Sequence, residues 1–84
     1  MHEENVMDIH MSDIMLHIDE ELNSKEQSIL ESQVRKQKGV VGLGYHDTRP
    51  HLMIIEYNLE TTSPKKLLHT VKGFGLHAEI VGFL

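Results

Sequence analysis

The spacing of apolar residues along this chain changes between a period of two, typical of β-strands, and the longer period of an α-helix. Apolar runs bounded by turn residues predict strands over residues 14–18, 40–46, 51–57 and 77–84. Helical spacing predicts one helix from about residue 23 to 38 and a second from 63 to 73. The order, β-α-β-β-α-β, is that of the ferredoxin-like α+β fold, in which two helices cover one face of a four-stranded antiparallel sheet.

Local signals mark the ends of both helices. Asn23 is a good N-cap, and Glu26, three residues later, completes the pattern of a capping box. Gly39 is the expected stop of this first helix. Ser63 followed by Pro64 is the pattern of an N-cap and a first helical residue.

Length and composition narrow the possible functions. The 84 residues suffice for one domain with a small core. Residues 1–11 mix acidic residues with His and Met without clear periodicity, so we expect a flexible extension over 1–11 and a folded domain over 12–84. The net charge of −5 argues against binding nucleic acid through its phosphates. The sequence has neither a membrane-spanning apolar run nor a signal-peptide pattern, so a cytoplasmic location is expected.

The segment from Asn58 to Val81 combines a strand end, a capped helix, a glycine stop and a final strand. In this spacing the chain resembles the heavy-metal-associated (HMA) domain, the copper-chaperone fold, from about residue 14 to 81. The family carries Cu(I) on a Cys-x-x-Cys pair that follows a Gly-Met pair. Counting back from Gly39 places those cysteines at Asn23 and Glu26, and the Gly-Met pair at residues 20–21. The chain has no cysteine, and oxygen ligands suit Cu(I) poorly.

Seven histidines offer another set of ligands. Imidazole suits Cu(II), Ni(II), Zn(II) and Co(II), so any of Cu, Zn, Ni or Co is a possible metal. His46 and His51 flank a short turn, and a carboxylate from Asp47 or Glu21 could complete a mixed site. The alternative is that these residues are exposed polar side chains of a turn.

Two further groupings of possible ligands remain open. His17 in the first strand would lie next to the last strand, which offers His77 and Glu79; the alternative is a polar pair across the strands. Near the N-terminus, His and Met side chains could together hold copper, or the tail could bind nothing. The residues of this last group are His2, Met7, His10, Met11 and Met15.

One face of the predicted sheet has no helix to cover it. Met15, Leu52 and Ile54 are expected there, with Val81 or Phe83 as further candidates. This face is more apolar than a solvated sheet needs, which indicates a protein partner or a homodimer.

The sequence offers no nucleophile or acid–base set typical of an enzyme. It therefore predicts a small non-enzymatic metal-binding or metal-handling protein with a cysteine-free His/carboxylate or His/Met site. The alternative is an HMA-like interaction module that has lost metal binding.

Overall fold

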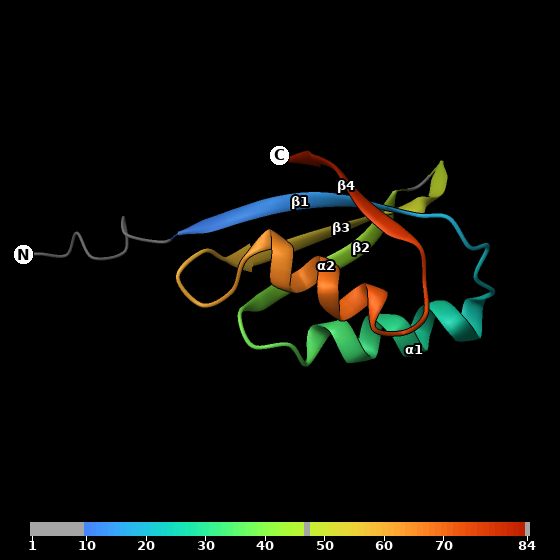
Figure 1. The fold of residues 1–84 in the computed structure, drawn as a ribbon, viewed down its shortest axis with the longest axis horizontal. Helices are drawn as coiled ribbons and strands as arrows, with labels where there is room; N and C mark the ends of the chain where they lie inside the picture. Colours follow the sequence, from blue (N-terminus) through green and yellow to red (C-terminus); the bar gives the residue numbers. More distant parts are fainter. Residues whose placement is uncertain (1–9, 47, 84) are drawn as a thin grey trace, which may run out of the picture.

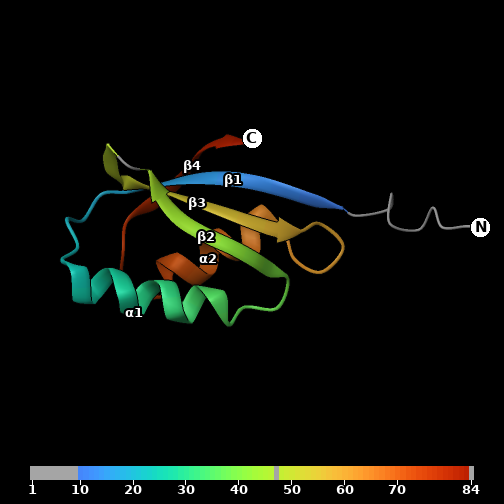
Figure 2. The same ribbon diagram turned by 180° about the vertical axis from the view of Figure 1, so that it is seen from behind.

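The structure, a computed structural model, describes residues 10–46 and 48–83. Its elements are β1 (Met11–Ile18), α1 (Ser24–Arg35), β2 (Val40–His46), β3 (Arg49–Asn58), α2 (Pro64–Lys72) and β4 (Ala78–Phe83). The strands form one antiparallel sheet in the order β2-β3-β1-β4. Both helices lie on the same side of this sheet (Figures 1 and 2). The ferredoxin-like α+β fold expected from the sequence is confirmed.

The core lies between the sheet and the helices. Alternate residues of the two central strands, β1 and β3, point into it, because side chains of a strand alternate between the two faces. Leu30 and Val34 of α1 and Leu67 and Val71 of α2 close the core from the other side. The strand residues are Ile14, Leu16, Ile18, Met53, Ile55 and Tyr57, and every residue of this core is at most 3% exposed.

The helices begin where their capping signals predict. α1 follows Asn23 with a complete capping box, and α2 follows Ser63, whose side chain accepts a hydrogen bond from the Lys66 amide. α1 ends at Arg35, earlier than expected, and Gly39 serves a different purpose. Gly39 has a φ of +97°, and a Cβ there would lie 2.9 Å from the Thr62 side chain. Glycine is therefore required to turn the chain into β2 close to the loop before α2.

Strand boundaries differ most at the chain start and at the hairpin. β1 begins at Met11, which pairs with Asn58, so the sheet already includes the last residue of the expected extension. Residues 1–9, with His2 and Met7, lie outside the described residues. β3 begins at Arg49, within the expected turn. None of the helices in the described ranges is long and apolar enough to cross a membrane.

The face of the sheet opposite the helices is called here the open face. Met15 lies on it, opposite Ile54 of β3 and Gly82 of β4. The register between β1 and β4 shifts after Met15, which places Phe83 opposite the buried Ile14. Paired residues share a face, so Phe83 lies on the helix side, and its assignment to the open face was wrong. The shift is a local irregularity of the ladder that the alternation of residues does not reveal.

Candidate functional site

The loop between β1 and α1 begins the candidate site, and its last residues form the cap of α1. The Asn23 Oδ1 atom accepts a hydrogen bond from the Glu26 amide at 2.8 Å. In return, the Glu26 Oε1 atom accepts from the Asn23 amide at 2.9 Å. Both side chains satisfy amides that the first turn of a helix would otherwise leave without partners. They are therefore engaged in holding the helix start.

The beginning of the same loop is tied to β4 through Glu20 and His77. One Glu20 oxygen lies 2.6 Å from the His77 Nδ1 atom, and the carboxylate also accepts from the His77 amide at 2.9 and 3.1 Å. These hydrogen bonds lower the pKa of Glu20 from its ordinary value of 4.5. The same side-chain hydrogen bond raises the pKa of His77 above its ordinary 6.5. The Asp19 amide donates to the His77 carbonyl at 2.8 Å, which completes the connection.

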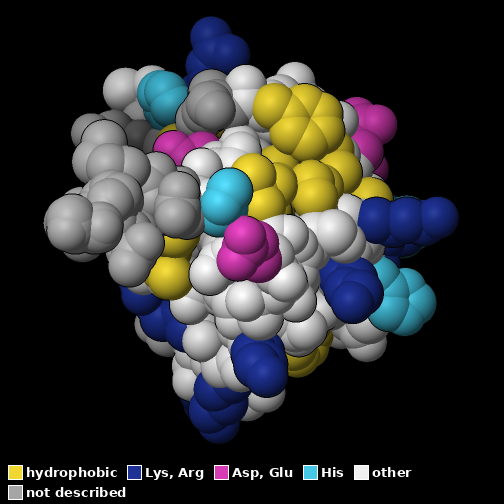
Figure 3. All heavy atoms as spheres, turned by 90° about the vertical axis from the view of Figure 1, so that its left-hand side faces the viewer, with side chains coloured by type: hydrophobic (Ala, Val, Ile, Leu, Met, Phe, Trp, Pro, Cys, Tyr) yellow, Lys and Arg dark blue, Asp and Glu magenta, His cyan; other side chains and the backbone are white. Residues whose placement is uncertain are grey.

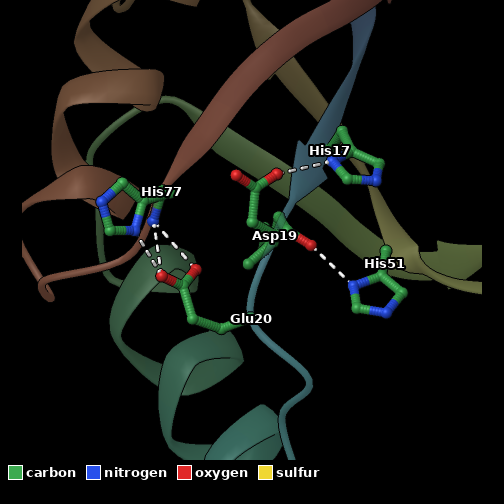
Figure 4. A network of polar contacts seen from close by, with 6 residues as sticks. His17, Asp19, Glu20, His51 and His77 are labelled. Atoms are coloured by element: carbon green, nitrogen blue, oxygen red, sulfur yellow. Dashed lines mark hydrogen bonds and ion pairs between the residues drawn. The ribbon is translucent and has the colours of Figure 1, made fainter.

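Two other histidines come together beside this loop. The rings of His17 (β1) and His51 (β3) are stacked, with centroids 5.7 Å apart and planes inclined by 18°. The His17 Nδ1 atom lies 3.1 Å from an Asp19 carboxylate oxygen. The His51 Nδ1 atom lies 2.7 Å from the Ile18 carbonyl oxygen. Figure 4 shows both contacts, with the second ring nitrogen of each histidine directed away from its hydrogen-bond partner.

These contacts fix which ring nitrogen is free to bind. A carbonyl oxygen or an ionised carboxylate can only accept, so in both rings Nδ1 carries the hydrogen and donates it. A neutral ring then has its lone pair on Nε2, the form in which histidine binds a metal. In metal sites the other ring nitrogen usually donates to a carboxylate or a backbone carbonyl, as it does here. In His17 and His51 alike, the Nδ1 atom is thus held by an acceptor, the Asp19 carboxylate or the Ile18 carbonyl.

The other expected ligands are placed differently. His46 lies opposite Arg49 in the hairpin, where the register shifts between Tyr45 and His46. An unshifted ladder would place Leu52 opposite His46, so neither register pairs it with His51. Its Nδ1 atom is 3.3 Å from the Thr48 amide. Asp47 lies outside the described residues. Glu21 is exposed. Among residues 10–46 and 48–83, no group of three or more His, Asp or Glu side chains lies close enough together to hold a metal ion.

Glu21 and His51 lie on the lining of a small hollow. Its volume is about 110 Å³, and its lining includes Glu20, Gln27 and Tyr45. Burial raises the pKa of Tyr45 to about 12, and the Glu31 carboxylate adds to the shift. The Tyr45 hydroxyl has no hydrogen-bond partner within the described part of the chain. Glu21 and His51 both line the hollow, but His46 does not.

Sequence reasoning missed the parts played by Asp19 and Glu20. Neither residue was assigned a histidine partner from the sequence. His17 was expected beside β4, and Glu79 is indeed opposite it in the register. His77, by contrast, bonds to Glu20, from which it is separated by 57 residues. A histidine two positions before a carboxylate at a strand end, as in His17 and Asp19, is the one local signal available.

No protein-family model and no curated protein matches the sequence. Solved structures do match. A copper-binding domain from HMA7, a P-type ATPase, has a TM-score of 0.77 at 11% identity, over 86% of this chain and 96% of that domain. The Cu(I)-loaded N-terminal domain of a potential copper-translocating P-type ATPase from Bacillus subtilis has a TM-score of 0.77 at 18% identity, with coverages of 88% and 91%. Oxidized MerP from Ralstonia metallidurans CH34 has a TM-score of 0.74 at 14% identity, with coverages of 86% and 99%.

The chain has the fold of these domains. The resemblance to HMA domains seen in the sequence is confirmed for the fold. Within this HMA fold, the positions that the resemblance assigns to cysteines hold Asn23 and Glu26, which form the helix cap. The oriented imidazoles of His17 and His51 belong instead to the neighbouring end of the sheet. If the scaffold binds a metal, the ligands with suitable chemistry are therefore outside the usual loop.

Proposed function

We propose that this protein is a small, non-enzymatic, cytoplasmic metal-handling module that binds a divalent transition metal at a cysteine-free site. The observation that carries the proposal is the stacked pair of His17 and His51, in which both Nδ1 atoms are engaged and neither Nε2 atom has a hydrogen-bond partner among residues 10–46 and 48–83. Imidazole nitrogens are the ligands that Cu(II), Ni(II), Zn(II) and Co(II) share. The match to copper-binding domains supports the same class of function.

Binding requires a modest movement of the two rings. Two nitrogens on one ion lie at most about 4.2 Å apart, since each bond is about 2.0–2.1 Å long. Rings stacked with centroids 5.7 Å apart reach this separation by tilting toward each other at the Nε2 edges. The two imidazoles supply two ligands, and water completes the coordination. The carboxylate of Glu21, which lines the same hollow as His51, can replace one water.

Calorimetric titration of the full chain with Zn(II), Ni(II), Co(II) and Cu(II) tests the proposal. We expect micromolar or tighter binding near neutral pH, which weakens below about pH 6 because only neutral imidazole is a ligand. A His17→Ala, His51→Ala variant should lose this binding. His69→Ala is the matched control, since His69 is an exposed histidine of α2 and lies apart from the pair. Unchanged affinity in the double variant would refute the assignment.

A spectroscopic measurement on the parent protein tests the site without depending on whether a variant folds. Nitrogen chemical shifts of the imidazoles report which ring nitrogen carries the hydrogen. In the metal-free protein, His51 should have its hydrogen on Nδ1, because the Ile18 carbonyl accepts it. On adding Zn(II), the Nε2 signals of His17 and His51 should shift, while those of His69 stay in place. Shifts confined to His46 would move the site to the hairpin.

The second candidate function is a protein-interaction module. It is favoured by the open face, where Met15, Leu52 and Ile54 are only partly covered although they lie in the middle of the sheet. This function does not require a metal. A chain that fails every metal titration but binds a protein through the open face would establish it in place of metal handling.

A further inference from the structure

The open face combines three features that none of the histidine sites uses. A ridge of Met15, Leu52 and Ile54 runs along its two central strands. Carboxylates lie beside the ridge at Asp13, Glu56 and Glu79. Glycines occupy the outward positions of both edge strands, where they pair with residues of the central strands: Gly42 with Glu56, Gly44 with Ile54 and Gly82 with Met15.

The packing of this chain does not require these glycines. A Cβ at Gly44 would meet nothing within 4 Å, and one at Gly82 would lie 3.9 Å from the Met15 Cβ atom, an ordinary contact. At Gly42 the nearest atom, at 3.2 Å, is the end of the flexible Glu56 side chain. Their backbones are also not in the left-handed region that favours glycine. Glycine within a strand weakens it and often marks a place where another backbone approaches closely.

The basic residues of the molecule lie away from the open face. Seven of the eight Lys and Arg residues lie in the helices or in the segments flanking them, and the eighth, Arg49, lies at the β2–β3 hairpin. Figure 3 shows Lys and Arg side chains mostly along the lower and right-hand sides of the molecule, and also at the top of the view. On the open face Asp13 lies directly opposite Glu56. Like charges in this position repel each other, so a cation between them would be stabilising.

The carboxylates of Asp13 and Glu56 lie beside a hollow in the surface. Its volume is about 330 Å³, and it is lined by Asp13 and Glu56, by Gly42 and Gly44, and by Ile54. The hollow is open at the glycines because they have no side chains, and no atom lies within 4 Å of where a Cβ at Gly44 would be. An extended Lys side chain has the matching chemistry, with an apolar stem for Ile54 and an ammonium group for the carboxylates.

We propose that the open face docks an extended, basic protein segment. Small apolar side chains of this segment lie on Met15 and Ile54, its backbone passes close to Gly44, and a Lys or Arg side chain enters the hollow beside Asp13 and Glu56. Charge decides against a second copy as the occupant. Face-to-face pairing would bring the carboxylates of one copy against those of the other without a cation from either open face.

The test uses the full chain without metal, in the presence of a chelator, so that its outcome is independent of the metal site. Two short peptides serve as probes, one with alternating Val and Lys and the other with alternating Val and Glu. Amide signals of Gly42, Gly44 and Gly82 are followed by NMR during each titration. We expect saturable shifts at these glycines with the Lys peptide only, and weaker binding as salt shortens the Debye length from about 30 Å to about 8 Å.

Substitutions at Gly44 and Glu56 decide whether the contact is specific. A Cβ at Gly44 meets no atom within 4 Å, so Gly44→Ala should fold, and Gly44→Val, which fills more of the hollow, should bind on the order of tenfold more weakly. Glu56→Gln should also weaken binding. Glu31→Gln, which changes the charge equally but lies on α1, is its matched control and should bind like the parent.

Three results would overturn the proposal. Equal binding of the Lys and Glu peptides would remove charge as the basis of recognition. Shifts confined to α1 and α2 would place the contact on the helix side. Sedimentation that shows the parent as a dimer and the Gly44→Val variant as a monomer would assign the open face to a second copy.

Discussion

Placing cysteines at the two positions that the HMA resemblance assigns to them should lower the free energy of unfolding and add Cu(I) binding. The perturbation is the double substitution Asn23→Cys, Glu26→Cys. Thiolates are soft ligands that select Cu(I), and the matched domains have the same fold, so the variant should acquire Cu(I) binding. It should also lose the capping box, because a thiol is a weak acceptor and neither of the two reciprocal hydrogen bonds can form.

The size of this loss follows from the geometry of the cap. Replacing an N-cap residue by one that cannot accept costs about 0.5–2 kcal/mol of the free energy of unfolding. Glu26 contributes the second hydrogen bond, but it is exposed, so the sum should stay near 1–2 kcal/mol. For a domain of this size, each 1 kcal/mol lowers Tm by roughly 4–8 °C. The metal-free double variant should therefore melt roughly 4–16 °C below the parent.

Thermal unfolding followed by circular dichroism, in reductant and chelator, measures the loss. Ser28→Cys is the control for thiol chemistry, since Ser28 is an exposed residue of α1 outside the cap. Cu(I) retention is measured in competition with a strong chelator, with the single Asn23→Cys variant for comparison. A double variant with the same Tm as the parent would show that the cap does not stabilise the fold in solution. One that releases Cu(I) as readily as the parent would show that these are not the family's ligand positions.

Two further predictions concern stability. The raised pKa of His77 stabilises the fold below about pH 6.5, and this contribution is lost as pH rises through the raised value, whereas the lowered pKa of Glu20 stabilises above about pH 4.5. The difference in Tm between the parent and His77→Gln should thus be largest between these two pH values and shrink above them; a difference that grows toward pH 9 would contradict the assignment. Gly44→Val should raise the free energy of unfolding, since replacing a strand glycine is worth about 0.5–1 kcal/mol and a Cβ at this position meets no atom within 4 Å. Urea unfolding measures this change, and a destabilised variant would show that Gly44 has a structural role.

Much of the fold could be predicted because its signals are local. The capping residues Asn23 and Ser63 each determine a helix start through contacts that span three residues. The alternation along β1 correctly separated Ile14, Leu16 and Ile18, which face the core, from Met15 and His17. Such signals depend only on neighbouring residues, so they can be read without knowledge of the rest of the structure.

The contacts of the candidate site could not be predicted in the same way. His51 is 33 residues from its acceptor at Ile18, and His77 is 57 residues from Glu20. Their partners depend on the register of whole strands, which shifts by irregularities between Tyr45 and His46 and after Met15. Each shift changes which side chains meet, yet the apolar pattern stays the same. The expected closeness of His46 and His51 across the hairpin failed because an unshifted ladder would place Leu52 opposite His46, and the observed one places Arg49 there.

His17 belongs both to the proposed metal site and to the proposed docking face. It belongs to the histidine pair, and on the open face it lies opposite Leu52 and Glu79. A divalent ion bound there would add positive charge to one end of an acidic face that is proposed to receive a basic segment. Metal should therefore weaken docking, and by reciprocity the docked segment should weaken metal binding by the same factor. Repeating the Lys-peptide titration with and without saturating Zn(II) measures this factor. Tighter docking in the presence of metal would mean that charge at this end of the sheet does not govern the contact, and the arrangement would then serve to recruit a partner to the loaded protein.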